Sequence, residues 1–134
     1  MARDQFGVVQ QIIKRQETEA GVRLSSAHGA LADAESQLKQ IIDYRQEYHR
    51  LATGENDSVT DTSQLQAARY FLSQLDKIAR QQRTAAQQAE RVLEQQRIAW
   101  ADAKRRLTAI EKLQSQREKK QQIAGEKREQ RALD

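Results

Sequence analysis

Apolar side chains recur every seven residues along the first part of the chain. Ten of the thirteen positions that this repeat defines between Phe6 and Tyr48 are apolar. Alternating steps of four and three residues between apolar positions are typical of the contact seam of a coiled coil. The repeat predicts a helix over residues 5–52. Its seam includes Phe6, Ile13, Ala20, Leu24, Ala27, Leu31, Ala34, Leu38, Ile41, Arg45 and Tyr48.

A second stretch, over residues 63–130, has the same repeat with fewer interruptions. Twelve of its fourteen seam positions between Leu65 and Ile110 are apolar, and the exceptions are Gln82 and Gln96. Beyond Ile110 the repeat continues with mainly polar residues, so we expect the helix to continue there without a partner. The apolar positions are Leu65, Ala68, Leu72, Leu75, Ala79, Ala86, Ala89, Leu93, Trp100, Ala103, Leu107 and Ile110.

A polar segment over residues 53–62 separates the two predicted helices. Gly54 suits the left-handed conformation that often ends a helix, and turn-forming residues follow it. Ser63 and Gln66 have the spacing of a capping box at a helix start, and Asp61 and Thr62 are alternative caps. The segment is therefore predicted to be a turn.

The lengths of the two seams favour an antiparallel hairpin over a parallel dimer. Folding the chain about a turn near Asp57 places Phe6 opposite about Ala109, and the second seam stops at Ile110. The predicted fold is all-α. A single domain over residues 1–134 forms a long two-helix antiparallel coiled-coil hairpin, with a C-terminal helical overhang.

The composition supports helices with a thin seam and argues against a globular core. Hydrophobic residues make up 37% of the 134 residues, aromatic residues 4% and charged residues 31%, and there is no proline. The absence of cysteine excludes disulfides and thiolate metal sites. The first residues lack the apolar core of a secretory signal, and no segment approaches the ~18 apolar residues that span a membrane. We therefore expect a soluble protein.

The residues offer little for catalysis. His28 and His49 are the only histidines, and neither has a second histidine or a cysteine at metal-ligand spacing. The five glycines are scattered, so they form no phosphate-binding loop. Carboxylates on a two-helix coiled coil face water, without the pocket that would shift their pKa values. We predict no catalytic, cofactor-binding or metal-binding residues, and no enzymatic activity.

Basic residues are concentrated in the last quarter of the chain. From Lys104 to Asp134 there are ten lysines and arginines against five acidic residues. The excess is open to three interpretations, namely a solvated helix end, a surface for an acidic protein, or a site for nucleic acid through its phosphates. No aromatic residue follows Trp100 to stack on bases, which disfavours nucleic acid.

An additional apolar row lies beside the second seam. Phe71, Ile78, Ala85 and Val92 repeat every seven residues, one position before the seam row that contains Leu72. They either widen the hairpin seam and pack the turn, or form an exposed surface for a partner, since exposed apolar rows often mark interfaces. We refer to these four residues as the ledge.

Several segments together resemble one protein family. The stretch from Leu38 to Tyr48 is similar to the "L..L..YR.EY" signature of the FliJ family of flagellar type III export proteins. In the same order follow the segments that begin at Tyr70, at Trp100 and at Glu111. The residues that carry the signature are Tyr44, Arg45, Glu47, Tyr48 and Trp100.

The resemblance implies a non-enzymatic stalk or adaptor of the flagellar export apparatus. Such proteins bind the hexameric export ATPase, the cytoplasmic domain of the export gate and substrate chaperones, and promote ATPase ring function. They lie in the cytoplasm and reach the inner face of the membrane through these partners. The implied gate-binding residues are Phe71, Leu75 and Ile78, while the last matching position, Gln82, is polar here.

The implied ATPase-binding region is the open end that holds both termini. An injectisome counterpart, a free coiled-coil chaperone and a nucleic-acid-binding arm remain open as alternatives, and so does the oligomeric state. The candidate ATPase-binding residues are Phe6, Ile13, Arg106, Lys112, Arg117, Lys119 and Lys120.

Overall fold

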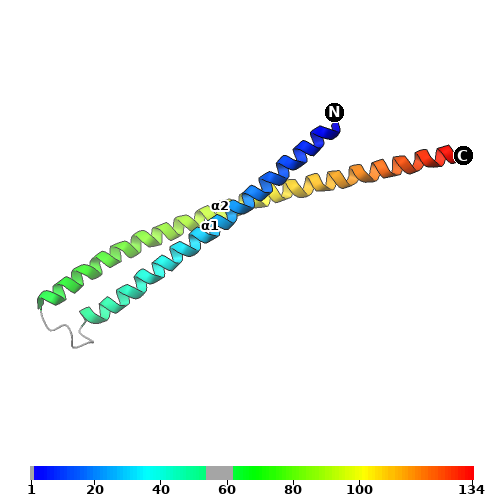
Figure 1. Cartoon of the computed structure of the whole chain (residues 1–134). Coiled ribbons are helices and arrows are strands. Elements are labelled where there is room, and N and C mark those ends of the chain that lie inside the picture. The colour runs from blue at the N-terminus through cyan, green and yellow to red at the C-terminus, as the bar shows by residue number, and fades with distance from the viewer. Residues whose placement is uncertain (1, 54–61) are drawn as a thin grey trace. The chain divides into compact units, whose positions relative to one another are not determined.

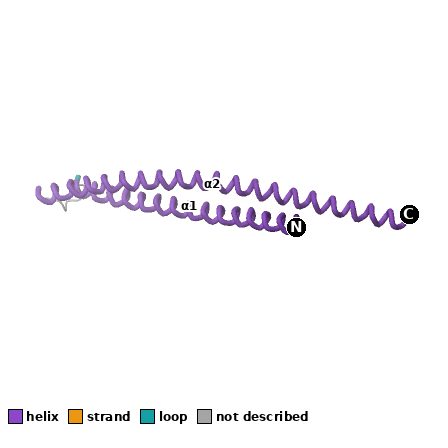
Figure 2. The backbone as a smooth tube through the Cα atoms, turned by 90° about the horizontal axis from the view of Figure 1, so that it is seen from above, coloured by secondary structure: helices purple, strands orange, loops and turns teal. Residues whose placement is uncertain are grey.

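A computed structural model describes residues 2–53 and 62–134 of the chain. These residues form two helices, α1 (Ala2–Ala52) and α2 (Thr62–Leu133), and none of them lies in a strand (Figure 2). The all-α hairpin prediction is confirmed, and each helix extends a few residues beyond the predicted bounds. Most of the predicted turn, including Gly54, falls outside the described residues.

Thr53 caps the C-terminal end of α1. Its backbone N–H donates to the carbonyl oxygen of His49 over 3.0 Å. Its hydroxyl lies 3.0 Å from the same oxygen and 3.3 Å from the carbonyl oxygen of Arg50. The last carbonyls of a helix lack partners within the helix, so these bonds stabilise the end of α1.

The contacts within the chain group into two compact units. The turn unit comprises Ser25–Gln95, and the terminal unit comprises Met1–Leu24 with Gln96–Asp134. In the turn unit the second half of α1 and the first half of α2 lie side by side and run in opposite directions (Figures 1 and 2). The prediction of a single domain stays a prediction.

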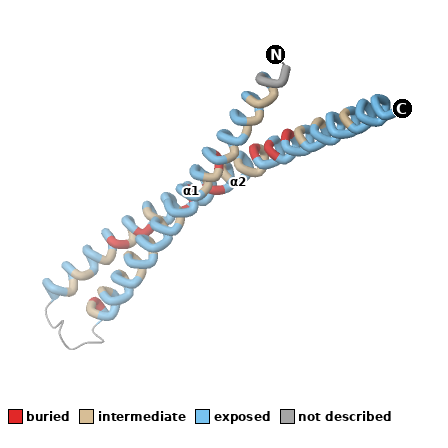
Figure 3. The backbone as a smooth tube through the Cα atoms, turned by 45° about the vertical axis from the view of Figure 1, so that its right-hand side comes forward, coloured by how far each residue is buried: buried red, intermediate tan, exposed pale blue. Residues whose placement is uncertain are grey.

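The seam of the turn unit is made of small and medium-sized apolar residues. Every position of the predicted repeat in this unit is buried or half-buried, and the surrounding positions are mostly exposed (Figure 3). Alanine at several seam positions allows the helix backbones to approach closely, because its side chain is short. The buried seam residues are Ala27, Leu75, Ala79, Ala86 and Leu93.

A glutamine side chain of α2 crosses the seam of the turn unit. The Gln82 amide nitrogen of α2 donates to the carbonyl oxygen of Ala34 over 3.2 Å and to Oε1 of Gln37 over 3.1 Å. A half-buried amide without partners would cost free energy, and these two bonds remove that cost. Gln82 is therefore accommodated in a seam row whose other positions are mostly apolar.

The seam of the terminal unit includes a larger residue. Ala20 of α1 is only 2% exposed. The indole N–H of Trp100 on α2 donates to Oε1 of Glu17 on α1 over 3.2 Å. Gly21 lies against the ring, and a Cβ atom at that position would be in ordinary contact with it, 3.5 Å from the indole nitrogen. The buried α2 residues of this unit are Ala103, Leu107 and Ile110.

The helix pairing in the terminal unit extends further than the sequence predicted. Phe6 lies against Arg117, not opposite Ala109, and Arg117 and Gln114 are half-buried beyond the last apolar seam residue. The heptad rows define which face of each helix is buried, but they leave the axial alignment of the helices undetermined. The exposed overhang therefore begins near Gln121 rather than directly after Ile110.

Candidate functional site

Three aromatic rings cluster across the two helices of the turn unit. Tyr48 and Phe71 have ring centroids 4.5 Å apart, and Tyr44 lies 5.3 Å from Tyr48 and 6.2 Å from Phe71. Tyr44 and Tyr48 come from one face of α1, because they are four residues apart. The Tyr44 and Phe71 rings meet edge to face, an arrangement that aromatic quadrupoles favour.

An ion pair stands beside the aromatic cluster. The Arg45 side chain of α1 donates to a carboxylate oxygen of Asp76 on α2. The two side chains are 40% and 39% exposed, so water screens much of their attraction. The pair therefore adds little stability, but it favours the axial alignment in which Phe71 meets Tyr48.

The ledge residues are exposed, while Phe71 also packs on the seam residue Tyr48, so features of both interpretations of the sequence are present. Phe71 is 37% exposed, Ile78 45% and Val92 36%, and Ala85 is also exposed. Their exposed apolar surface lies beside the hairpin seam. Tyr44, 48% exposed, borders this row from the α1 side.

The other residues that the resemblance assigned to the gate contact lie differently. Leu75 is buried in the seam, so it presents almost no surface to a partner. Gln82 reaches across to α1 through its two hydrogen bonds. The structure thus brings Phe71 and Ile78 together on the surface and leaves Leu75 and Gln82 within the helix pair.

The electrostatic surroundings of the cluster raise the pKa of the Tyr44 hydroxyl above its usual value near 10. The largest cause is the charge of Tyr48, followed by burial, a hydrogen bond with Tyr48, and the negative charge of Glu47. The neutral phenol is therefore favoured throughout the physiological range. At such pH values Tyr44 presents an uncharged, amphipathic side chain beside the ledge.

The family-signature residues divide between the two units. Tyr44, Arg45 and Tyr48 gather in the turn unit against the Phe71 segment, whereas Glu47 is exposed on α1. Trp100 belongs to the terminal unit, where it contacts Glu17 and Gly21. The sequence identified each of these residues as part of the family signature, but it did not predict which of them are in contact.

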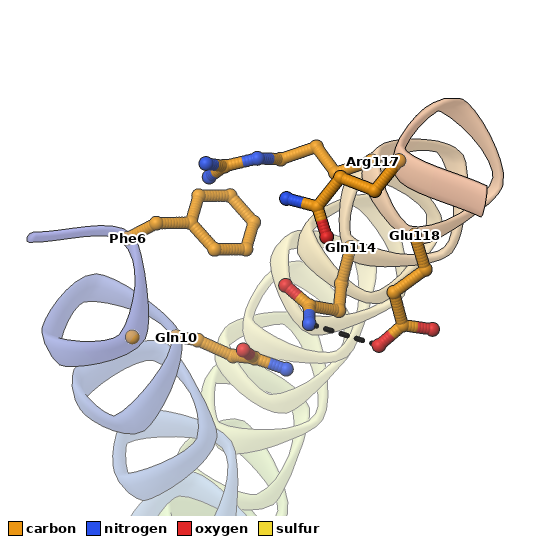
Figure 4. A pocket seen from close by; sticks show the side chains of 7 residues that line it. Phe6, Gln10, Gln114, Arg117 and Glu118 are labelled. Carbon is orange, nitrogen blue, oxygen red and sulfur yellow. Dashed lines mark hydrogen bonds between the residues drawn. The ribbon is translucent and has the colours of Figure 1, made fainter. Parts of the chain in front are cut away.

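The terminal unit holds the candidate ATPase-binding residues. The Arg117 guanidinium lies over the Phe6 ring, 4.4 Å from its centroid, at the edge of a shallow pocket (Figure 4). Ile13 is half-buried in the seam, and Arg106, Lys112, Lys119 and Lys120 are exposed. The pocket is lined by Phe6, Gly7, Gln10, Gln114, Arg117, Glu118 and Gln121.

The described part of the chain contains no group of three or more histidine, cysteine or carboxylate side chains that could hold a metal ion. His28 and His49 are exposed. Within residues 2–53 and 62–134, neither helix has a stretch long and apolar enough to cross a membrane. What the described residues offer is an exposed apolar row in one unit and a basic helix end in the other.

A comparison with known protein families matches residues 2–134 to the family described as "Flagellar FliJ protein". The chain belongs to this family. Compared with individual curated proteins, the chain has no match. Since the family match covers nearly every residue, the FliJ resemblance of the separate segments is confirmed. Membership makes the chain a component of the flagellar export apparatus, and it favours the flagellum over the injectisome.

Two features of this FliJ-family chain were not predicted from the sequence. One is the Arg45–Asp76 pair, and the other is the packing of Tyr44 and Tyr48 on Phe71. Both depend on the axial alignment of α1 and α2. The opposite charges of Arg45 and Asp76 could have indicated this alignment. The sequence analysis instead centred the turn near Asp57, which does not place these two residues opposite each other.

Proposed function

We propose that the chain is a non-enzymatic adaptor of the flagellar export apparatus with two separate binding regions. The ledge of the turn unit binds the cytoplasmic domain of the export gate. The basic, open end of the terminal unit binds the hexameric export ATPase and promotes the function of its ring. Through these contacts the adaptor acts in the cytoplasm at the inner face of the membrane, and it assists delivery of substrate chaperones.

The observation that carries the proposal is the exposure of the ledge beside the signature residues. Phe71 and Ile78 keep more than a third of their surface in water, although the seam next to them is closed. Full burial of such a side chain contributes roughly 1.5–3 kcal/mol, and covering the part that is still exposed contributes a corresponding fraction of it. A partner that covers the ledge therefore gains affinity without disturbing the helix pair.

The charge distribution supports the second binding region. Residues 104–134 carry a net charge of +5, from ten basic and five acidic residues, whereas the rest of the chain carries 13 basic and 14 acidic residues. Most of the basic side chains beyond Ile110 are exposed. An acidic protein surface would attract this end in a salt-dependent manner.

The gate contact is tested by the variants Phe71→Ala and Tyr70→Ala. Tyr70 is the neighbouring aromatic residue, is 68% exposed, and lies outside the ledge. We expect Phe71→Ala to weaken binding of the purified gate cytoplasmic domain by about tenfold or more, as for a central interface residue. Tyr70→Ala should bind as the unmodified chain does.

Circular dichroism accompanies the binding measurement, because Phe71 also packs on Tyr48. We expect Phe71→Ala to keep its helicity, since position 71 lies beside the seam and the seam residues of both helices are unchanged. Equal loss of affinity in both variants, or unchanged affinity of Phe71→Ala in a folded chain, would contradict the gate-binding role of the ledge.

A further inference from the structure

The ledge lies on one flank of the turn unit, and α1 contributes to the same flank. Tyr44 and Gln37 of α1, seven residues apart, meet Phe71 and Gln82 of α2 respectively. Ala30 is the preceding member of that α1 row and is exposed. The flank therefore presents a shallow strip of apolar side chains from both helices, with Gln37 as the polar exception.

The α2 edge of this strip is polar but uncharged. Each residue there lies three positions after a ledge residue, so it is a neighbour on the outer side of the same helix face. All four are exposed glutamines. They are Gln74, Gln81, Gln88 and Gln95.

The α1 edge of the strip is acidic. The corresponding row on α1 consists of Ser26, Asp33, Gln40 and Glu47, all exposed, with two carboxylates and no basic residue. The residues Gln40, Asp43, Tyr44, Gln46, Glu47 and Arg50 line a shallow depression at the end of this row. The acidic edge thus adjoins the aromatic end of the ledge.

The opposite flank of the turn unit differs both in its apolar surface and in its charges. It has no comparable apolar row on α2, because the equivalent positions are Arg69, Asp76, Arg83 and Glu90. Arg80 and Lys39 add positive charge on that side. The two flanks of one seam therefore offer different surfaces, and only one suits an apolar partner.

We infer that the element covering the ledge is an amphipathic α-helix, with apolar residues at seven-residue spacing and basic residues along the edge that faces α1. It would complete a three-helix coiled coil with α1 and α2 over the turn unit. This inference rests on the proposed gate-binding function and specifies the kind of segment that the gate domain presents.

The spacing of the ledge selects a helix over an extended segment. Seven residues of helix rise about 10.5 Å, so an aligned helix meets successive ledge residues with successive turns of one face. An extended chain covers that distance with about three residues. Because side chains alternate along a strand, an odd step would turn every second contact away from the ledge.

The charges at the edges of the strip determine which sides of the partner helix carry charged residues. Asp33 and Glu47 attract lysine or arginine on its α1 side, while the glutamines of the α2 edge accept neutral polar residues. A helix with acidic residues on the α1 side would be repelled. The ledge therefore distinguishes partners by charge as well as by apolar spacing.

Cross-linking to the gate cytoplasmic domain tests the helical form. The chain has no cysteine, so Gln81→Cys and Gln88→Cys each provide a single attachment site for a photo-cross-linker beside the ledge. We expect the two variants to label gate residues seven positions apart in one segment. Labels about three positions apart would show an extended segment and overturn the inference.

Charge reversal tests the predicted basic edge. The double variant Asp33→Lys with Glu47→Lys should weaken gate binding by roughly tenfold at low salt, whereas Glu35→Lys on the opposite flank should leave it within about twofold. Stronger binding of the double variant, or equal effects of both, would overturn the charge assignment.

The outcomes for the two proposals are separable. If Phe71→Ala abolishes gate binding but the cross-links lie about three residues apart, the proposed function stands and the helical partner is wrong. If Phe71→Ala leaves gate binding unchanged, or the gate domain does not bind the chain, the proposed function is wrong and this inference falls with it.

Discussion

Trp100 and Gly21 pair a large residue with a small one in the terminal unit. The indole ring lies against the face of α1 where Gly21 has no side chain, and its N–H is satisfied by Glu17. Glycine inside a helix costs about 1 kcal/mol relative to alanine. A Cβ atom at Gly21 would be in ordinary contact with the ring, not in collision with it.

The variant Gly21→Ala should therefore raise the free energy of unfolding by about 1 kcal/mol. Chemical denaturation followed by circular dichroism measures this change, and Trp100 fluorescence reports the ring. Gly29→Ala is the matched control, because a Cβ atom there meets nothing within 4 Å. It should stabilise the chain similarly without altering fluorescence. Destabilisation by Gly21→Ala alone would contradict the fit described for Trp100.

At the residue scale, the sequence predicted which side chains are buried but not what the polar ones do. Every predicted seam position up to Ile110 is buried or half-buried. The rows reveal this because burial in a coiled coil follows helical periodicity. Gln82, an exception in its row, proved to bond Ala34 and Gln37, which no periodicity indicates.

At the scale of the helices, the axial alignment of α1 and α2 was the quantity that the sequence did not provide. Sliding one helix by a whole heptad keeps the same faces in contact, so the rows alone leave several alignments possible. Specific contacts between the helices select one of these alignments, namely the Arg45–Asp76 pair, the Gln82 bonds and the Trp100–Glu17 bond. The heptad rows left the exposure of the ledge open as one of two alternatives, and the Tyr44–Phe71 contact depended in addition on the alignment.

The Arg45–Asp76 pair should couple the helices weakly. A double-mutant cycle with Arg45→Ala and Asp76→Ala should give a coupling of about 0.2–1 kcal/mol, decreasing at high salt. Arg105 and Asp102, which pair within α2, provide a control cycle that joins no second helix. A coupling of several kcal/mol would contradict the screening expected at this exposure.

Truncation should separate the paired part of α2 from its overhang. A chain ending at Gln121 should unfold with the same free energy as the full chain, because nearly all residues beyond it are exposed. A chain ending at Leu113 loses the Phe6–Arg117 contact, of about 0.5–1 kcal/mol, together with the half-buried Gln114. Denaturation curves of both distinguish them, and equal stabilities would contradict the extended pairing.

At the scale of the whole molecule, the chain combines two surfaces of different chemistry. The turn unit offers an apolar ledge with an acidic edge, and the terminal unit offers an exposed, basic helix end. Apolar contacts depend little on salt, whereas exposed charges are screened within about 8–10 Å at physiological ionic strength. The two binding activities should therefore respond differently to salt.

Raising the salt concentration from 50 to 500 mM (about tenfold) should weaken ATPase binding more than gate binding. Parallel affinity measurements with the two purified partners test this expectation. The double variant Lys119→Gln with Lys120→Gln should reduce the salt dependence of ATPase binding and leave gate binding unchanged. Equal salt dependence for both partners would contradict the division between an apolar and a basic surface.

The most direct test of the adaptor account is a bridging assay. The gate cytoplasmic domain is immobilised, and retention of the export ATPase is measured with and without the full chain. We predict that the ATPase is retained when the chain or its Tyr70→Ala variant is present, and that retention is lost with Phe71→Ala. ATPase retention that is independent of the chain, or equal for Phe71→Ala and Tyr70→Ala, would contradict the account.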